Sequence, residues 1–343
     1  MKVVIPKLLT WYLKDHRDLP WRNTINPYHI WVSEMILQQT RVDQGLPYYY
    51  RFLDKFPQIT DLARAHEDDI LAVWQGLGYY ARARNMHRTA KFLVNECGGE
   101  FPKNFEKLKK LKGIGPYTAA AIASFAFQIP VPAVDGNVKR VVARYYGIDT
   151  NIESPAFFKL AFALLLDVIP PSSADTFNQA MMELGALICK PQSPLCIECP
   201  LLDNCSAFAL KRTAELPVRI KKIKITQRFI QFVAFQCGDE FLLRQRPSEG
   251  IWGGLFEYPH FDISGEAGHE FPYAECPWDM PIKPPVLRTQ ILHKLSHQHL
   301  NARLWICEVE AKTEVLNTLG KWVHFDELKS FPLHKLMRNF VSL

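Results

Sequence analysis

The sequence has little of what marks extracellular, fibrous or disordered proteins. Only 8 of its 343 residues are cysteine, which is too few for a scaffold held together by disulfides. With 48% hydrophobic and 22% charged residues, its composition is that of an ordinary globular protein and excludes a collagen, a coiled-coil rod or a wholly disordered chain. At about 150 residues per domain, the length predicts two domains.

No stretch of the sequence is suited to span a membrane. The longest run without charge, residues 113–134, contains three prolines and two glycines, so we expect a buried helix followed by a proline-rich loop. Charged residues near the start interrupt any signal-peptide core, and we expect no secretory signal. These features predict a cytoplasmic protein with no membrane partner, associated with the nucleoid if the source is bacterial.

The positive charge is concentrated in one part of the chain. The net charge of the whole sequence is only +6, but residues 1–226 carry +8 and residues 227–343 carry −2. A solvated basic surface would explain this pattern. A polyanion partner would explain it as well, because phosphate contacts need clustered lysine and arginine.

Four of the eight cysteines lie within 17 residues, in the pattern C-x6-C-x2-C-x5-C. They are Cys189, Cys196, Cys199 and Cys205. The other four are scattered, and we interpret them as small apolar residues. Disulfides are not expected without export, and zinc sites more often have two C-x2-C pairs separated by a longer loop. Four thiolates at this spacing favour an iron–sulfur cluster.

The character of the sequence changes after residue 212. Before it, apolar residues recur at helical spacing between glycine and proline breakers. The expected helices cover 28–40, 67–75, 80–94, 117–127 and 172–189. Later segments have the alternating and aromatic character of strands, and a helix is expected at 326–341. The expected strands cover 227–236, 240–246, 286–295 and 300–310. We predict an all-α domain over 1–212, a basic linker over 213–225 and an α+β domain over 226–343.

Two glycines precede an expected helix in the segment LKGIGPYTA, residues 111–119. The backbone around Gly113 and Gly115 could bind a phosphate at the helix N-terminus, although an ordinary turn between helices is an alternative. Further along the chain, Asp135 starts the segment DGNVKR. It could simply cap a helix, but Lys139 and Arg140 follow closely, as a helix that faces phosphates requires.

Glu34 lies in the segment WVSEMILQQT, residues 31–40, among large apolar neighbours. A carboxyl group in such surroundings has a raised pKa, which a general acid needs near neutral pH. The alternative is that Glu34 points to water from an amphipathic helix. The amides of Gln38 and Gln39 are suited to contact base edges or the space between bases.

Together these motifs resemble the endonuclease III superfamily of DNA glycosylases, which carries a helix–hairpin–helix. Within it, the segments PWR, SEMILQQT, GLGYYARARN and FNQAMMELGALIC are similar to MutY-type adenine DNA glycosylases. The resemblance covers essentially the whole chain and implies a multidomain fold. It implies an all-α glycosylase domain with a cluster loop at 189–205, followed by an α+β Nudix-like domain. It also implies a [4Fe–4S] cluster on the four cysteines.

The resemblance implies a base-excision repair enzyme that hydrolyses the N-glycosidic bond of adenine opposite 8-oxoguanine, and also of A:G mispairs. Adenine would be flipped out of double-stranded DNA into a pocket. Glu34 would protonate adenine N7, and Asp135 would stabilise the oxocarbenium ion of the sugar. Tyr117 and Asn137 would position the sugar and the carboxylates. Relatives with lyase activity have a lysine in place of Tyr117, so a monofunctional enzyme is expected.

Other implied contacts belong to the adenine pocket, the duplex and the lesion. Four residues would line the pocket, namely Trp21, Arg22, Leu37 and Glu183. Gln39 and Tyr79 would wedge into the duplex where the base has left. The family reads 8-oxoguanine with a Phe-Ser-His turn, and this chain has Leu295, Ser296 and His297 in its place. The Nudix box is missing, so no Nudix hydrolase activity is expected.

Two other interpretations stay open. One is a bifunctional glycosylase and AP lyase that acts on damaged pyrimidines, against which Tyr117 argues. The other is a catalytically silent DNA-binding protein, against which the presence of both carboxylates argues. A monomer is expected, because an asymmetric mispair does not require a symmetric reader.

Overall fold

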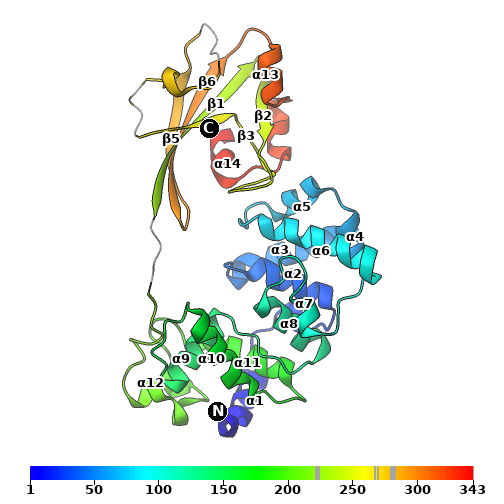
Figure 1. The fold of residues 1–343 in the computed structure, drawn as a ribbon, viewed down its shortest axis with the longest axis vertical. Helices are drawn as coiled ribbons and strands as arrows, with labels where there is room; N and C mark the ends of the chain where they lie inside the picture. The colour runs from blue at the N-terminus through cyan, green and yellow to red at the C-terminus, as the bar shows by residue number, and fades with distance from the viewer. Residues whose placement is uncertain (221–224, 266–267, 269, 279–282, 343) are drawn as a thin grey trace. The chain divides into compact units, whose positions relative to one another are not determined.

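The computed structural model describes residues 1–220, 225–265, 268, 270–278 and 283–342. Two compact units are present, and Figure 1 shows helices in one and a sheet in the other. The first unit comprises Met1–Arg64 and Asn85–Lys221, and the second comprises Ala65–Arg84 and Lys222–Leu343. The domain boundaries at 212 and 226 stay a prediction. The two units are divided differently from the predicted domains, since residues 65–84 group with the C-terminal part of the chain.

Helices, connected by turns and loops, are the regular secondary structure of residues 1–209. They are α1 (Ile5–Asp15), α2 (Pro27–Leu37), α3 (Val42–Lys55), α4 (Ile59–Arg64), α5 (Glu67–Trp74), α6 (Ala81–Cys97), α7 (Phe105–Leu108), α8 (Pro116–Phe127), α9 (Gly136–Tyr146), α10 (Pro155–Leu166), α11 (Ala174–Leu187) and α12 (Ser206–Ala209). All five expected helices are present. The first ends at Leu37 rather than at residue 40, because Gln39 has a left-handed backbone with a φ of 61°.

The uncharged run at 113–134 forms α8 and the loop after it. Residues Thr118 to Ser124 of α8 are all buried, so the helix is apolar around its circumference because protein surrounds it. The helix ends at Gln128, which has a φ of 54°, and an extended proline-containing segment leads to α9. Among the described residues, no helix is both long enough and apolar enough to cross a membrane.

A core of apolar side chains joins α1, α9, α10 and α11 in the first unit. Fully buried examples are Leu8, Val142, Phe157 and Phe177. Because α9 and α11 share this core, the residues at their ends are fixed relative to one another. The start of α9 and the length of α11 both contribute to the site described below.

The second unit contains a mixed sheet of seven strands in its described residues. They are β1 (Thr226–Cys237), β2 (Glu240–Gln245), β3 (Phe256–Glu257), β4 (His260–Ile263), β5 (Val286–Lys294), β6 (Gln298–Glu308) and β7 (Lys321–His324). The order is β3-β2-β1-β6-β5, with β4 on β1 and β7 on β2. All four expected strands are present.

Both faces of the central strand β1 are buried. Phe232 and Ala234 pack on α14 (Lys335–Val341), whereas Val233 and Phe235 belong to a second core that includes Leu316 of α13 (Glu314–Leu319). Strand β1 pairs with β6 in parallel over its length, and Thr226 N–H at its start donates to His297 O at 3.2 Å. The expected helix at 326–341 is wrong in its middle, because Pro332 separates a 3-10 turn at Phe325–Ser330 from α14.

The start of the predicted linker is attached to the first unit. Leu216 is buried, and its carbonyl accepts a hydrogen bond of 2.8 Å from Arg144 Nε. Val218 O accepts from Ile152 N–H at 2.9 Å. Residues 221–224 of the predicted linker lie outside the described residues.

Candidate active site

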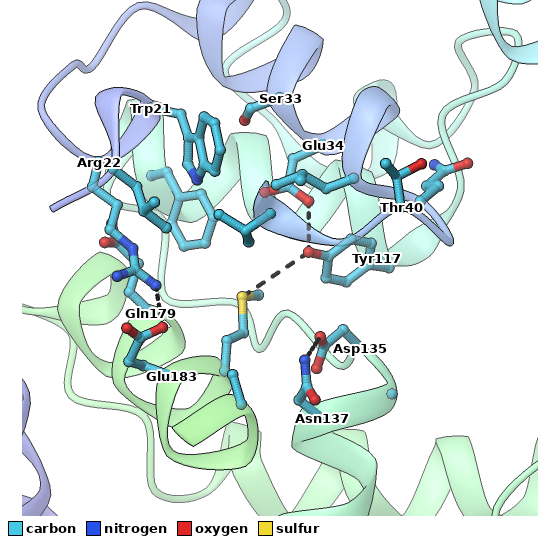
Figure 2. A pocket seen from close by; sticks show the side chains of 18 of the residues that line it. Trp21, Arg22, Ser33, Glu34, Thr40, Tyr117, Asp135, Asn137, Gln179 and Glu183 are labelled. Atoms are coloured by element: carbon cyan, nitrogen blue, oxygen red, sulfur yellow. Dashed lines mark hydrogen bonds and ion pairs between the residues drawn. The ribbon is translucent and has the colours of Figure 1, made fainter. Parts of the chain in front are cut away.

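A cavity of about 500 Å³ lies in the first unit among α2, α8, α9 and α11. Figure 2 shows its side chains converging from these elements. The sequence-predicted residues that line it are Trp21, Arg22, Glu34, Leu37, Gln38, Gln39, Tyr117, Asp135, Asn137, Lys139 and Glu183. These residues come from five separate segments of the sequence, including the 3-10 turn Pro20–Arg22, and the fold brings them to one cavity.

Glu34 points into the cavity from the last turn of α2. Residues Ile30 to Ile36 of this helix are all buried, and Glu34 itself is 7% exposed. The alternative of a carboxylate that faces water is therefore wrong. Burial raises the pKa of Glu34 to about 7, although a hydrogen bond from Tyr117 opposes the shift. Near neutral pH, a substantial fraction of Glu34 holds a proton.

Tyr117 connects Glu34 to the rest of the cavity. It is the second residue of α8, and its hydroxyl donates to Glu34 Oε2 at 2.5 Å. The same hydroxyl lies 4.0 Å from Met182 Sδ on α11. Burial raises the pKa of Tyr117 well above its ordinary value, so the phenol stays a neutral donor. Figure 2 shows it between Glu34 and Asp135.

Asp135 is the N-cap of α9, as the cap interpretation of its motif expected. Its Oδ1 accepts from Val138 N–H at 2.7 Å, and its Oδ2 accepts from Asn137 Nδ2 at 3.0 Å. Burial raises the pKa of Asp135, and these N–H donors act against that shift. The positive end of the helix dipole also favours the anion at this position.

The two carboxyl groups therefore differ in their surroundings. Glu34 accepts one hydrogen bond from a phenol in an apolar setting, whereas Asp135 accepts from two N–H groups at a helix N-terminus. The negative charge of Asp135 raises the pKa of Glu34 further, and the N–H donors favour the anion at Asp135. We expect Asp135 to ionise first and Glu34 to keep its proton.

Glu183 is a buried anion on the opposite wall of the cavity. Its Oε2 accepts from Arg17 Nη2 at 2.6 Å and from Arg22 Nη2 at 2.7 Å, and its Oε1 accepts from Arg17 Nε at 2.8 Å. Burial alone would raise the pKa of Glu183, but the hydrogen bonds from the two arginines outweigh it and lower the pKa to about 2. This wall presents a fixed ion pair, which Figure 2 shows at Arg22.

Helix α11 approaches α9 closely beside Asp135. A Cβ on Gly185 would lie 2.6 Å from Asn137 Cβ, so only glycine permits this approach. Arg140 donates to Asn137 Oδ1 at 2.9 Å, to Gly185 O at 2.6 Å and to Cys189 O at 2.7 Å. Asn137 is therefore held from both sides, and its amide stays directed at Asp135.

The glycine hairpin lies outside the cavity and connects α7 with α8. Gly113 has a φ of 78°, and a Cβ there would lie 2.6 Å from Asn85 Cβ. Thr89 Oγ1 donates to Lys112 O at 2.7 Å and so fixes the turn on α6. Gly115 is exposed at the start of α8, where nothing within 4 Å would meet a Cβ. The backbone here is open to an approaching anion.

Tyr79 and the Leu295–His297 turn belong to the second unit. Tyr79 follows α5 with a φ of 47°, and the residue is 53% exposed. Its hydroxyl lies 3.4 Å from Ser296 Oγ in the turn between β5 and β6. Ser296 and His297 are exposed, whereas Leu295 is half-buried against the core of the sheet. The two features predicted to read the duplex and the lesion thus lie together within this unit.

The four clustered cysteines line one small cavity in the first unit, of about 30 Å³. Among the described parts of the chain, no three His, Cys, Asp or Glu converge on one metal ion. A four-iron cluster binds each cysteine to a different iron, so it needs sulfurs around a cavity rather than at one point. Buried Arg144 donates to Cys189 Sγ at 3.4 Å and to Lys190 O at 2.6 Å. The residues present fit a cluster.

Several lining residues were missed in the sequence. Arg17, Gln179 and Met182 all line the cavity. Gln179 lies four residues before Glu183 on α11, so helical spacing could have placed both side chains on one face. No comparable signal pointed to Arg17, because its partner Glu183 is 166 residues away.

The burial of Glu34 predicts a pH-dependent stability difference. The pKa of Glu34 is about 7 in the fold against an ordinary 4.5, so its favourable contribution is complete below about pH 4.5 and is lost as the pH rises through 7. Glu34→Gln cannot ionise, and we expect it to be more stable than the wild type by about 1–3 kcal/mol at pH 8. Urea unfolding at pH 5 and pH 8 measures the difference.

The gain from Glu34→Gln should shrink at pH 5. Glu96→Gln, which changes an exposed carboxyl group on α6, is the matched control and should leave stability unchanged at both pH values. An equal effect of Glu34→Gln at the two pH values would contradict the assigned pKa.

Comparisons with known proteins cover both units. The model of the HhH-GPD superfamily base excision DNA repair proteins matches residues 32–162. The NUDIX domain model matches residues 230–343. A thermostable thymine-DNA glycosylase of known structure covers 61% of this chain and 96% of its own, with a TM-score of 0.56 and 29% identity. An endonuclease III structure at 24% identity and a TM-score of 0.53 shows the same helical fold.

Curated relatives extend over most of the chain. The adenine DNA glycosylase of Buchnera aphidicola subsp. Schizaphis graminum is 38% identical over 74% of this chain and 74% of its own. The rat adenine DNA glycosylase is 32% identical over 96% of this chain and 76% of its own. The human adenine DNA glycosylase is 30% identical over 96% and 72%. Given this extent, the chain belongs to the adenine DNA glycosylase family and is a DNA N-glycosylase of base-excision repair.

Proposed function

We propose that this enzyme releases adenine mispaired with 8-oxoguanine, and also adenine in A:G mispairs, by acid-assisted hydrolysis. The observation that carries the proposal is the pair Glu34 and Asp135, which line one cavity in different surroundings. One group keeps a proton near neutral pH and the other favours its anion. This is the division of labour that cleavage of a glycosidic bond requires.

Glu34 acts as the general acid. A purine anion is a poor leaving group, and a proton on N7 lets the base take up the electrons of the C1′–N9 bond as neutral adenine. The pKa of about 7 gives Glu34 a proton to donate at working pH. Tyr117 donates to Oε2 at 2.5 Å and thereby holds the carboxyl group in one orientation.

Asp135 acts on the sugar. Departure of adenine leaves positive charge on C1′ and O4′, and an ionised Asp135 stabilises that oxocarbenium ion or traps it transiently. Water then adds to C1′, and its proton passes to the Glu34 carboxylate, which restores the acid. Asn137 donates to Asp135 Oδ2 at 3.0 Å and so fixes the carboxylate that faces the sugar.

The flipped adenine binds between the ion pair and the acid. Buried Trp21 and half-buried Leu37 supply apolar contact with the base. Glu183 offers a hydrogen-bond acceptor, and Arg22, which neutralises it, offers a donor. Their ion pair fixes both groups, which can bind the edge of adenine that carries the exocyclic amine. Base flipping exposes this edge to the cavity.

The duplex is bound by backbone contacts and opened by two side chains. The glycine hairpin around Gly113 and Gly115 and the side chain of Lys139 bind phosphates. Gln39 and Tyr79 enter the stack, with Gln38 contacting base edges beside them. The support for this role is conformational: Gln39 and Tyr79 both have left-handed backbones, with φ of 61° and 47°. Such strain in a residue other than glycine is concentrated at functional sites.

The turn between β5 and β6 reads the lesion. 8-Oxoguanine differs from guanine by an oxygen at C8 and a hydrogen on N7, which Ser296 and His297 can bind through exposed polar atoms. Tyr79, 3.4 Å from Ser296, would stack beside the same base. Leu295 replaces the family's phenylalanine and anchors the turn in the sheet core.

The cysteine loop binds a [4Fe–4S] cluster and stabilises the fold. Cys189, Cys196, Cys199 and Cys205 would each ligate one iron. The cluster would supply a rigid, electron-rich centre that holds the loop, with no position left for substrate. Buried Arg144 holds the loop from inside, and the exposed Lys190 gives it positive charge towards phosphates.

A bifunctional lyase is the nearest alternative. It would require an amine that attacks C1′, and the chain has Tyr117 with a raised pKa at that place. The enzyme should therefore leave an abasic site without cutting the strand. Borohydride trapping of a covalent DNA complex would favour the alternative.

Loss of either carboxyl group should abolish catalysis. We expect Glu34→Gln and Asp135→Asn to lower the single-turnover rate on an A:8-oxoguanine duplex by at least about 10³-fold, because one lacks the proton and the other the counter-charge. Binding of the duplex should survive. Glu96→Gln and Asp54→Asn, at exposed positions, are the controls. Turnover retained by either variant would remove that group from the mechanism.

Ser296→Ala should weaken discrimination between lesions rather than catalysis. Loss of one hydrogen bond of about 1 kcal/mol would reduce the preference for A:8-oxoguanine over A:G about fivefold. The ratio of the two single-turnover rates at subsaturating enzyme measures it, with Ser264→Ala as the control. An unchanged ratio would exclude Ser296 from lesion recognition.

Cys199→Ser should remove the cluster. Purified wild type should contain about four iron atoms and about four sulfides per chain, and the variant much less of both. Cys97→Ser, outside the loop, should keep them. Zinc in place of iron in the wild type, or wild-type iron content in Cys199→Ser, would contradict the assignment.

A further inference from the structure

Arg82 is a buried cation with no part in the chemistry described above. It is the second residue of α6, only 8% exposed. Burial of the guanidinium lowers the pKa of Arg82 to about 10, which means that the fold holds this charge at a cost. Its contacts include four with the segment just before it, Trp74 to Tyr79.

The guanidinium of Arg82 binds this segment in two ways. Its Nη2 lies 3.4 Å from Leu77 O and 3.2 Å from Gly78 O, and donates to both. Its Cζ lies 5.2 Å from the ring centre of Trp74 and 5.8 Å from that of Tyr79. Trp74 Nε1 also donates to Gly78 O, at 3.1 Å. The carbonyl of Gly78 therefore has two buried donors.

The segment that Arg82 binds has an unfavourable backbone. Gly76 and Gly78 have φ of 99° and 72°, and Tyr79 has a φ of 47°. The glycines tolerate this conformation, but a tyrosine does not favour it. Despite the strain, Tyr79 is 53% exposed. The carbonyls that Arg82 binds come from the two residues just before Tyr79.

We propose that Arg82 is the positioning residue that holds Tyr79 in the conformation with which it enters the duplex. The inference rests on the proposed function, because it takes Tyr79 as the side chain that enters the stack. Hydrogen bonds to the two preceding carbonyls set the direction of the chain, and the cation under the ring fixes the side chain. Arg82 thus acts on DNA only through Tyr79.

Arginine is required for this role because of its shape. A guanidinium is planar, so it donates in its plane to carbonyls while its face contacts aromatic rings. A lysine has the same charge but cannot do both at once. Arg82→Lys therefore keeps the charge and removes the geometry, which separates positioning from general electrostatic attraction to DNA.

A double-mutant cycle with Tyr79 tests the proposal. The variants are Arg82→Lys, Tyr79→Ala and the double variant, with Arg88→Lys as the matched change at an exposed position of the same helix. Affinity is measured on a duplex in which a non-hydrolysable adenosine analogue faces 8-oxoguanine. Fluorescence of 2-aminopurine at the target position reports extrusion of the base.

We expect Arg82→Lys to weaken binding and to reduce the fluorescence gain about tenfold in the presence of Tyr79, and less than twofold in Tyr79→Ala. Arg88→Lys should change neither. Equal effects of Arg82→Lys in both backgrounds would overturn the proposal and leave Arg82 a structural role. No effect in the wild-type background would overturn it as well. If Arg82→Lys does not fold, as judged by its melting temperature, Arg82→Gln carries the same cycle.

Failure of this inference differs from failure of the proposed function. A wild-type enzyme that releases no adenine from A:8-oxoguanine duplexes would contradict the function itself. A wild-type enzyme that is active, with additive effects of Arg82→Lys and Tyr79→Ala, would contradict only the role of Arg82.

Discussion

The burial of Glu34 is the constraint on which the site depends. A carboxyl group at the end of an apolar helix would be a defect in an ordinary core, because its charged form loses hydration. Here the hydroxyl of Tyr117 donates a hydrogen bond to Glu34, but burial still raises the pKa of Glu34, so the group stays partly protonated at neutral pH. The other charged groups of the cavity are arranged so that the unfavourable burial of Glu34 can be tolerated. Two arginines neutralise the anion Glu183, and Asp135, the other carboxyl group of the proposed mechanism, lies at a helix N-terminus.

Helix α11 organises the first unit because residues at successive positions along it contact different parts of that unit. Asn178 accepts from Ala133 N–H and donates to Val131 O, both at 2.9 Å, and thereby fixes the segment that leads to Asp135. Glu183 forms the wall of the cavity, and Gly185 permits contact with α9. Cys189, two residues after the end of the helix, is the first cysteine of the loop. A rigid helix of 14 residues therefore sets the spacing between the cavity and the cysteine loop.

The parts of the fold that were predictable are those with a local chemical cause. The burial of Glu34 followed from its apolar neighbours, and the helix start at Asp135 followed from cap chemistry. The cysteine loop followed from its spacing. What escaped prediction depends on distant partners. No local pattern pairs Arg17 with Glu183, and the left-handed turn at Gln39 ended a helix that its apolar residues favoured. Pro332 was a visible signal that the helix expected at 326–341 would break, and it was overlooked.

The pairing at the start of β1 has a consequence for how the second unit finds its target. Thr226, the first residue of the strand, binds His297 O of the turn beside Ser296, so the chain enters this unit directly at that turn. The turn is thus the first part of the sheet that the chain reaches after Leu216 and Val218, which are bound to the first unit. The second unit also includes residues 65–84, which continue in sequence into the first unit at both ends. Under the proposed function, the first unit and this turn bind the same duplex. Because they are parts of one chain, binding by one raises the effective concentration of the other at that duplex, and recognition of the opposite base is an intramolecular event.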